Sequence, residues 1–274
     1  MDKDHAVLYR YEQLLAINKP ARLPCHPGGR NLHHTLIHLL RRDLHPADPI
    51  LAHRLDRETS GVVLLVLDRR HGPALYRQFA KRTVAKRYEV FVEGIFPPSL
   101  LADGYLMHDP DSIVRKRRRF VPASQMAEVP LEAERAITRF TRLGTDGTIS
   151  HLAAEPQTGR LHQIRATLHS LGFPVVGDKI YGVDSNLSLK FCADTLDATD
   201  RQRLRIARQA LHASSIHGIH PATGEPFTCN ALLPADLQPL AKKCANTHCG
   251  TQKDPRQTMI HDAYPRNIEQ AKSI

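Results

Sequence analysis

The chain has 274 residues, 41% hydrophobic and 24% charged, so it is long enough to bury a substantial core. It contains no run of about 18 apolar residues, and its N-terminal MDKDHAVLYR lacks the apolar stretch of a secretory signal, which argues against a membrane-spanning or exported protein. The net charge of +10 and the pI of about 9.6 favour a polyanionic partner, because basic side chains that neutralise phosphates release counterions.

The cysteines do not form the pattern of a disulfide framework, so we expect a reducing, cytoplasmic location. The five are Cys25, Cys192, Cys229, Cys244 and Cys249. The spacing of Cys244, His248 and Cys249 fits no standard zinc knuckle, and no glycine-rich phosphate loop is present. We therefore expect no bound metal.

The first third of the chain predicts strands and short helices in alternation. Residues 7–18 are apolar and partly alternating, which indicates a strand or hairpin. Residues 32–42 place leucines on one helical face, and residues 73–82 predict a second short helix. Between them, the polar loop 53–61 leads into residues 62–67 (VVLLVL), an apolar, partly β-branched run that predicts a buried strand.

Two further strands are predicted in the middle of the chain. Residues 86–94 (KRYEVFVEG) alternate, so that Tyr88, Val90 and Val92 share one face. Residues 136–143 predict another strand, followed by a turn at 144–147 (GTDG).

The clearest helix covers residues 161–171, with leucine and isoleucine at helical spacing. Thr158 is a candidate cap for its start, and Gly172 a candidate for its end. Strands with intervening helices but few βαβ-length units predict an α+β fold, with a mixed or mainly antiparallel central sheet flanked by helices and loops. The periodicity fades after Pro234.

Asp56 is the first candidate for chemistry, because it sits in a polar loop directly before a buried strand. Arg54 and Arg57 flank it and favour its charged form, which suits a nucleophile or base. The alternative interpretation is an ion-paired surface turn. Arg165 could reach a buried carboxylate or phosphate from the helix, or could lie on a solvated face. Tyr88 is either a core residue or a stacking surface for a base.

Basic clusters suit contacts with phosphate, or alternatively form solvated charged loops. They lie at residues 41–42, 81–82, 86–87 and 115–119.

Residues 53–61 (HRLDRETSG) resemble the HRLDxxTSG signature of the RluA-type pseudouridine synthases. Further motifs of that family occur in the same order. They are NKP with His26–Pro27, 86–94 (KRYEVFVEG), Ala136 with Thr138, 158–165 (TGRLHQIR), 177–182 (GDKIYG), 211–213 (LHA), 220–225 (HPATGE) and 232–236 (LLPAD). A nine-residue signature with ordered companions is far more specific than one short motif.

The resemblance implies a role for individual residues. Asp56 corresponds to the catalytic aspartate, Arg165 to the arginine that pairs with it, and Tyr88 to the aromatic residue that stacks on the target base. Leu211 corresponds to the apolar residue that packs at the site, and Arg54 to an arginine implicated in displacing the target base. The same motifs place five more residues in the expected substrate site: His53, Thr59, Gly159, Arg160 and His162.

The implied reaction isomerises uridine in structured ribosomal or transfer RNA to pseudouridine, with attack by Asp56 at C1′ or at C6. An isomerisation requires no cofactor, so RNA is the expected partner and a monomer the expected state. Residues 1–238 would form the catalytic domain, without the S4 RNA-binding domain of many members, and residues 239–274 a basic, poorly ordered tail. Three positions depart from the family pattern: Arg22 replaces a glycine, Leu161 a threonine and Thr167 a histidine.

Two other classes of function remain open at this stage. One is a non-catalytic RNA-binding or ribosome-assembly protein on the same fold. The other is a hydrolase with paired carboxylates, which would need a second acid at a suitable distance from Asp56. No motif supplies that second acid.

Overall fold

The computed structural model describes residues 6–28, 33–45, 47–112, 114–184 and 186–245. The strands are β1 (Ala6–Tyr11), β2 (Leu14–Lys19), β3 (Ile50–Leu51), β4 (Ser60–Val66), β5 (Ala85–Glu93), β6 (Ser99–His108), β7 (Arg118–Pro122), β8 (Glu134–Thr145), β9 (Ile149–Pro156), β10 (Leu211–Ile219) and β11 (Pro226–Asn230). The α-helices are α1 (Leu36–Asp43), α2 (Gly72–Ala80), α3 (Gln163–Ser170), α4 (Asn186–Cys192), α5 (Ala198–Leu204) and α6 (Gln238–Ala245). Short 3₁₀ turns cover Arg69–His71 and Ala123–Gln125.

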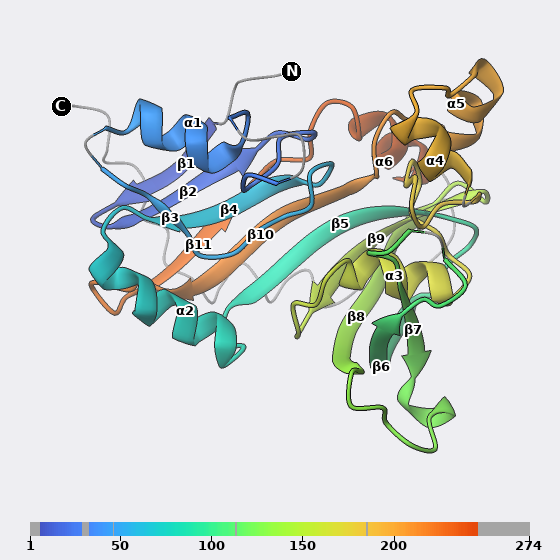
Figure 1. Ribbon diagram of the computed structural model, residues 1–274, viewed down its shortest axis with the longest axis horizontal. Coiled ribbons are helices and arrows are strands. Elements are labelled where there is room, and N and C mark those ends of the chain that lie inside the picture. Colours follow the sequence, from blue (N-terminus) through green and yellow to red (C-terminus); the bar gives the residue numbers. More distant parts are fainter. Residues whose placement is uncertain (1–5, 29–32, 46, 113, 185, 246–274) are drawn as a thin grey trace.

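The described strands form an 11-stranded sheet that crosses the whole molecule (Figure 1). Its order is β1-β2-β4-β10-β5-β9-β8-β6-β7, with β11 paired to β10 and β3 to β4. Of the pairings between these strands, β4–β10 is parallel and the others are antiparallel. The predicted α+β fold with a mainly antiparallel sheet is therefore confirmed. No helix in this part of the chain has the length and apolar character needed to cross a bilayer.

Strands β2 and β4 are covered on both faces. Leu15 and Ile17 point toward α1, whereas Leu14 and Ala16 point into a second core that includes Leu75 of α2. All seven residues of β4 are buried, as the apolar run predicted. The predicted strand or hairpin at 7–18 is the β1–β2 hairpin.

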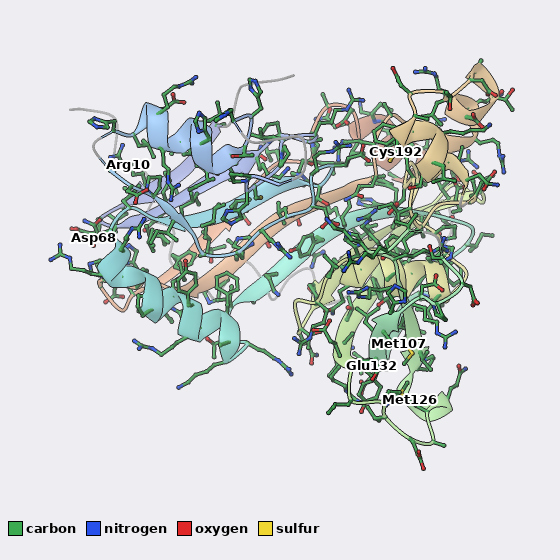
Figure 2. All side chains as sticks on the ribbon, in the orientation of Figure 1. Arg10, Asp68, Met107, Met126, Glu132 and Cys192 are labelled. Carbon is green, nitrogen blue, oxygen red and sulfur yellow. The ribbon has the colours of Figure 1, made fainter. Side chains whose placement is uncertain are left out.

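The second half of the sheet carries α3 on one face and α6 on the other. Val90 and Val92 of β5 pack with Ile164 and Leu168 of α3, and Tyr88 lies at the edge of the same cluster. Phe91 points to the opposite face, where Leu240 and Cys244 of α6 cover it. Met107, Met126 and Glu132 mark the outer end of the β6–β8 lobe, which projects away from α1 and α2 (Figure 2).

Gly61 joins the two halves of the sheet. Its φ is +113°, and a Cβ at this position would lie 2.2 Å from the carbonyl oxygen of Ala213. Only glycine allows β4 and β10 to approach this closely, because glycine adopts positive φ without steric cost. The parallel register pairs Ala213 with Gly61 and so brings Leu211 beside the loop that carries Asp56.

Several predicted details differ from the structure. Helix α3 begins at Gln163, because His162 adopts the left-handed conformation (φ 55°). Thr158 does not cap the helix; its hydroxyl donates to Oε1 of Gln163 over 2.7 Å. Gly144 belongs to β8 and not to the following turn. The expected tail begins with the ordered helix α6, and its remainder, 246–274, lies outside the described residues.

Candidate active site

Lys19 supports the loop that carries Asp56. It is the last residue of β2 and is fully buried. Its ammonium group donates to the carbonyl oxygens of Pro20 and Leu23 over 2.9 Å and of Arg57 over 3.3 Å. Burial lowers the pKa of Lys19 to about 8. The amide of Leu55 also donates to Sγ of Cys25 over 3.4 Å. These contacts fix the backbone on both sides of Asp56.

Arg165 connects Asp56 to a second, fully buried carboxylate. Its Nη1 donates to Oδ2 of Asp56 over 2.8 Å. Its Nε and Nη2 form a bidentate pair with Asp178 over 2.6 and 2.8 Å. The Arg165 side chain is only 5% exposed, whereas that of Asp56 is 28% exposed. Asp178 therefore holds the guanidinium, and the guanidinium holds Asp56 at the surface of a cleft.

Asp56 is ionised at neutral pH. Burial acts to raise the pKa of its carboxyl, but the Arg165 guanidinium acts in the opposite direction and leaves the pKa below its ordinary value. Its second oxygen, Oδ1, accepts no hydrogen bond from any described residue, and its nearest ion-pair candidate is Nε2 of His162 at 3.9 Å. Oδ1 is the oxygen that is free to react.

Asp178 and Tyr181 also hold Arg165 in place, although neither is among the ten residues that the sequence predicted for the site. Oδ1 of Asp178 also accepts from the backbone amides of Ile180 and Tyr181 over 2.9 and 3.0 Å. The buried ring of Tyr181 lies 5.0 Å from the Arg165 guanidinium. Both residues belong to the GDKIYG motif at 177–182, which is the sequence signal that pointed to them.

His162 is neutral in this site. Burial and then the nearby Arg165 lower the pKa of its imidazole to about 4. Its Nδ1 and the hydroxyl of Tyr181 are 3.0 Å apart. The left-handed backbone at His162 is stabilised by Gln163, whose Oε1 accepts from the amide of Arg160 over 3.0 Å and whose Nε2 donates to the Thr138 hydroxyl over 2.9 Å. A non-glycine residue held in this conformation is a common feature of functional sites.

A cleft of about 460 Å³ opens above Asp56 and Arg165, and all ten residues predicted for the site line it. They are His53, Arg54, Asp56, Thr59, Tyr88, Gly159, Arg160, His162, Arg165 and Leu211. Their individual roles remain predictions. Burial, with Asp56 and Cys25 nearby, raises the pKa of Tyr88, so its hydroxyl keeps its proton. Tyr88 and Leu211 supply an aromatic and an apolar wall beside the carboxylate.

His53 and Thr59 anchor the two ends of the loop. Nε2 of His53 accepts from the amide of Leu64 over 3.1 Å, and its ring stacks on Phe79 with centroids 5.1 Å apart. Burial and then Lys86 lower the pKa of His53 to about 3, so the imidazole stays neutral as this hydrogen bond requires. The hydroxyl of Thr59 accepts from Nε2 of Gln209.

The mouth of the cleft is basic. Arg54 and Arg82 are exposed there, and neither makes an ion pair with a residue that the structure describes. Lys86 donates to the carbonyl oxygen of Thr158 over 3.3 Å, and Arg160 pairs with Glu134 at 3.2 Å. Gly159 is exposed, and a Cβ added to it would meet only Nζ of Lys86. Unpaired arginines at the mouth of a cleft suit an anionic ligand.

Two sequence candidates do not belong to this cleft. Arg117, from the basic cluster at 115–119, forms an ion pair with Asp109 at 3.0 Å and lies 2.6 Å from Nε2 of His169. Cys229 and Cys244 lie in different hydrophobic clusters, and the described residues hold no group of three or more ligands suited to a metal ion. His248 and Cys249 lie outside the described residues.

Comparison with known proteins gives consistent matches. A model of the family described as RNA pseudouridylate synthase matches residues 13–170. The chain belongs to this family. Ribosomal large subunit pseudouridine synthase D of Xanthomonas campestris pv. campestris is 35% identical over 238 residues, which cover 85% of this chain and 67% of that protein. An uncharacterized RNA pseudouridine synthase of Chloroflexus aurantiacus is 34% identical over 230 residues, covering 81% of this chain and 63% of that protein.

The fold of this RNA pseudouridylate synthase family member has counterparts among solved structures. Human RNA Pseudouridylate Synthase Domain Containing 4 aligns with a TM-score of 0.64 and 24% identity over 86% of this chain and 93% of that one. The family, the enzyme class and the fold implied by the signature are confirmed, and nothing in these matches favours the non-catalytic alternative. The chain spans about two thirds of the length of the two relatives above.

Proposed function

We propose that this family member isomerises specific uridines in ribosomal RNA to pseudouridine, with Asp56 as the reacting carboxylate. The observation that carries the proposal is the position of Asp56. It is held 2.8 Å from a buried arginine, it keeps one oxygen free, and it faces a cleft with an aromatic wall and a basic mouth. Relatives named as ribosomal large subunit pseudouridine synthases support ribosomal RNA as the substrate.

The substrate uridine must leave its helix, because the glycosidic bond is inaccessible inside the stack. Extrusion costs a few kcal/mol, which contacts with the phosphates and the base must offset. A cleft of about 460 Å³ lies within the range of small-ligand sites. Exposed Arg54 and Arg82 suit the phosphates, and the Tyr88 ring suits stacking on the base.

Oδ1 of Asp56 then attacks, either at C1′ with departure of N1 of uracil, or at C6 of the ring. In both routes the N1–C1′ bond breaks, the uracil turns within the cleft, and C5 forms the new bond to C1′. Asp56 leaves as a carboxylate, displaced from C1′ in the first route or eliminated from C6 in the second. The C5 proton leaves to solvent, and N1 takes up one proton. Atoms and electrons balance without an oxidant or reductant. The walls of the cleft keep the detached base near the sugar, which is a proximity effect of several kcal/mol. Arg165 keeps Asp56 ionised and oriented throughout.

Release of tritium from RNA labelled as [5-³H]uridine measures this reaction directly. The unchanged protein should release tritium from ribosomal RNA transcribed without modifications. Asp56→Asn should release none while folding normally. Asp111→Asn, an exposed acid in the β6–β7 connection, is the matched control and should keep full activity. Tritium release by Asp56→Asn would refute the assignment, and free uracil as the product would indicate a hydrolase.

A further inference from the structure

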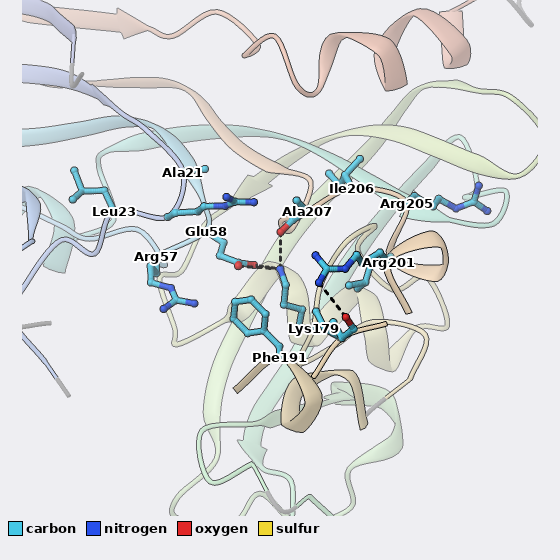
Figure 3. A pocket seen from close by; sticks show the side chains of 13 residues that line it. Ala21, Leu23, Arg57, Glu58, Lys179, Phe191, Arg201, Arg205, Ile206 and Ala207 are labelled. Atoms are coloured by element: carbon cyan, nitrogen blue, oxygen red, sulfur yellow. Dashed lines mark hydrogen bonds and ion pairs between the residues drawn. The ribbon is translucent and has the colours of Figure 1, made fainter. Parts of the chain in front are cut away.

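A second cavity, of about 820 Å³, lies beside the active-site cleft and shares none of its lining residues. The catalytic loop separates the two, because Arg57 and Glu58 line the second cavity whereas Asp56 and Thr59 line the cleft. The opposite wall comes from α4, α5 and the segment 204–207 (Figure 3). We call this space the α4–α5 cavity.

Unpaired guanidinium groups surround the α4–α5 cavity. Arg22, Arg57 and Arg201 line it and are exposed, and none of them forms an ion pair with a carboxylate in the described part of the chain. The other cations are already neutralised: Lys179 pairs with Glu58 at 2.9 Å and Arg205 with Glu93 at 3.0 Å. Three unpaired cations around a concave surface create a positive potential that attracts anions.

The floor of this cavity is apolar. Leu23 and Leu204 are buried, and Phe191, Leu196 and Ile206 are partly buried. The Arg57 guanidinium carbon lies 5.6 Å from the centre of the Phe191 ring, and Nζ of Lys179 lies 4.6 Å from it. Figure 3 shows Lys179 and Phe191 between Arg57 on one side and Arg205 on the other. An apolar floor beneath a cationic rim fits a ligand that has both a planar ring and a phosphate.

We propose that the α4–α5 cavity binds a second nucleotide of the substrate RNA, with its phosphate at Arg22, Arg57 and Arg201 and its base on the apolar floor. The inference rests on the proposed function, since it takes RNA as the substrate. The volume is ample for a nucleotide. A free nucleotide has the same chemistry, but an RNA strand already in the cleft would present its other nucleotides at high local concentration.

The α4–α5 cavity also touches the parts that position Asp56. Arg57 follows Asp56 in the chain, and its carbonyl oxygen accepts from Lys19. Lys179 follows Asp178, which holds Arg165. Occupation of this cavity would therefore fix the loop from the side opposite the cleft. It would contribute mainly to RNA affinity, because none of its lining residues reaches the reacting atoms.

RNA affinity of single variants tests the site. Arg57→Gln and Arg201→Gln should each raise the Kd for in vitro transcribed large-subunit ribosomal RNA about tenfold, as expected for one lost phosphate contact. Each should also reduce the slope of log Kd against log salt by about 1. For Arg201→Gln, the rate of tritium release at saturating RNA should stay within about twofold, because Arg201 lies outside the catalytic loop.

Arg10→Gln is the matched control, because it removes the same charge at the far end of the molecule from Cys192 of α4 (Figure 2). Equal changes in Kd for Arg10→Gln and Arg201→Gln would overturn the proposal, since only net charge would then matter. An effect confined to Arg57→Gln would also overturn it, by assigning the loss to the catalytic loop.

A photoreactive benzophenone side chain at position 191 should crosslink to nucleotides other than the isomerised uridine. Complete loss of the crosslink with excess free uridine monophosphate, at concentrations that leave RNA bound, would assign the cavity to a free nucleotide instead. The crosslink and the Kd values do not depend on turnover. If no tritium is released but both results hold, the isomerase assignment fails and the second RNA site stands.

Discussion

The inner wall and the mouth of the active-site cleft differ in the burial and in the pairing of their charged side chains. On the inner wall, Arg165 is buried, and Asp178 and Tyr181 lie buried behind it; short contacts hold the polar atoms of all three. At the mouth, Arg54 and Arg82 are exposed and have no carboxylate partner among the described residues. The first arrangement fixes a geometry before substrate arrives, and the second leaves charge available for a flexible polyanion.

This contrast separates two kinds of effect. Changes on the inner wall should lower the rate at saturating RNA and the stability of the fold, with little change in affinity. Changes at the mouth or in the α4–α5 cavity should lower affinity and its dependence on salt, with little change in rate. A variant that violated this division would show that the two regions are not independent.

Arg165→Ala should give the largest effect, because it leaves two carboxylates without their shared cation. Breaking a buried pair costs about 3–5 kcal/mol, so the free energy of unfolding should fall by that amount. The rate should fall by at least about 100-fold because Asp56 loses its orientation. The Kd for RNA should change less than about threefold, since a side chain this buried does not reach phosphate.

Chemical denaturation, single-turnover tritium release and filter binding measure these three quantities. Arg165→Lys keeps the charge but loses the forked geometry, so it should fold better and still react slowly. Equal losses of rate and affinity in both variants would instead make Arg165 a phosphate contact.

Asp178→Asn should give the next largest effect. It keeps the shape of the side chain but removes the charge that balances Arg165, so the guanidinium would act more strongly on Asp56. The pKa of Asp56 should fall further and its nucleophilicity with it, lowering the rate by about 10- to 100-fold. The acid limb of the pH–rate profile should therefore move to lower pH. A slower enzyme with an unmoved profile would show that Asp178 only supports the fold.

The two histidines His162 and His53, which line the cleft, predict that the protein loses stability in acid. Burial holds the pKa of His162 at about 4 and that of His53 at about 3, below the unfolded value of about 6.5. Between these pKa values and pH 6.5, the unfolded chain binds more protons than the folded chain does. The contribution of the two neutral imidazoles to stability is therefore complete above pH 6.5 and falls as the pH drops toward 4. His162 alone should contribute about 3 kcal/mol of that loss. The lowered pKa values of Asp56 and Asp178 act only below about pH 4.

Urea unfolding at pH 7 and pH 4.5 measures this slope. His162→Gln should make it shallower, and His45→Gln, an exposed control, should leave it unchanged. An equal slope in both variants would show that other groups govern the acid transition.

Strong local patterns predicted much of the fold. The apolar run of β4 and the alternation of β5 identify strands because burial on one or both faces leaves a periodic trace. Strand β10 leaves no such trace, since its fully buried His212 is satisfied by the Ser60 hydroxyl and the carbonyl oxygen of Ala231. Gly144 suggested a turn, but a Cβ there would lie 2.6 Å from a carbonyl oxygen of α6, a contact from a distant part of the chain.

The sequence predicted which residues form the site, but it did not predict the contacts between them. The position of Asp56 in a polar loop before a buried strand made it a candidate, and the motif resemblance added its companions, all of which line one cleft. The link through Asp178 was not predicted, because an acid followed by Lys179 looks like an ordinary surface pair. The α4–α5 cavity was not predicted because Arg22, Arg57 and Arg201 are far apart in sequence, and no one motif contains all three.

Arg22→Gly should give the smallest effect and the sharpest contrast between stability and affinity. Arg22 has a φ of 68°, a left-handed conformation that costs a non-glycine residue about 1 kcal/mol, and it replaces the glycine usual in the family pattern. Glycine should relieve this cost, so the free energy of unfolding should hold or rise by up to about 1 kcal/mol. RNA affinity should nevertheless fall severalfold, because the cavity loses one unpaired guanidinium.

Arg22→Gln, which keeps the strain and loses the charge, should show the same loss of affinity without the gain in stability. Denaturation curves and Kd values for the two variants would separate the strain from the charge, and unchanged affinity in both would remove Arg22 from the RNA site.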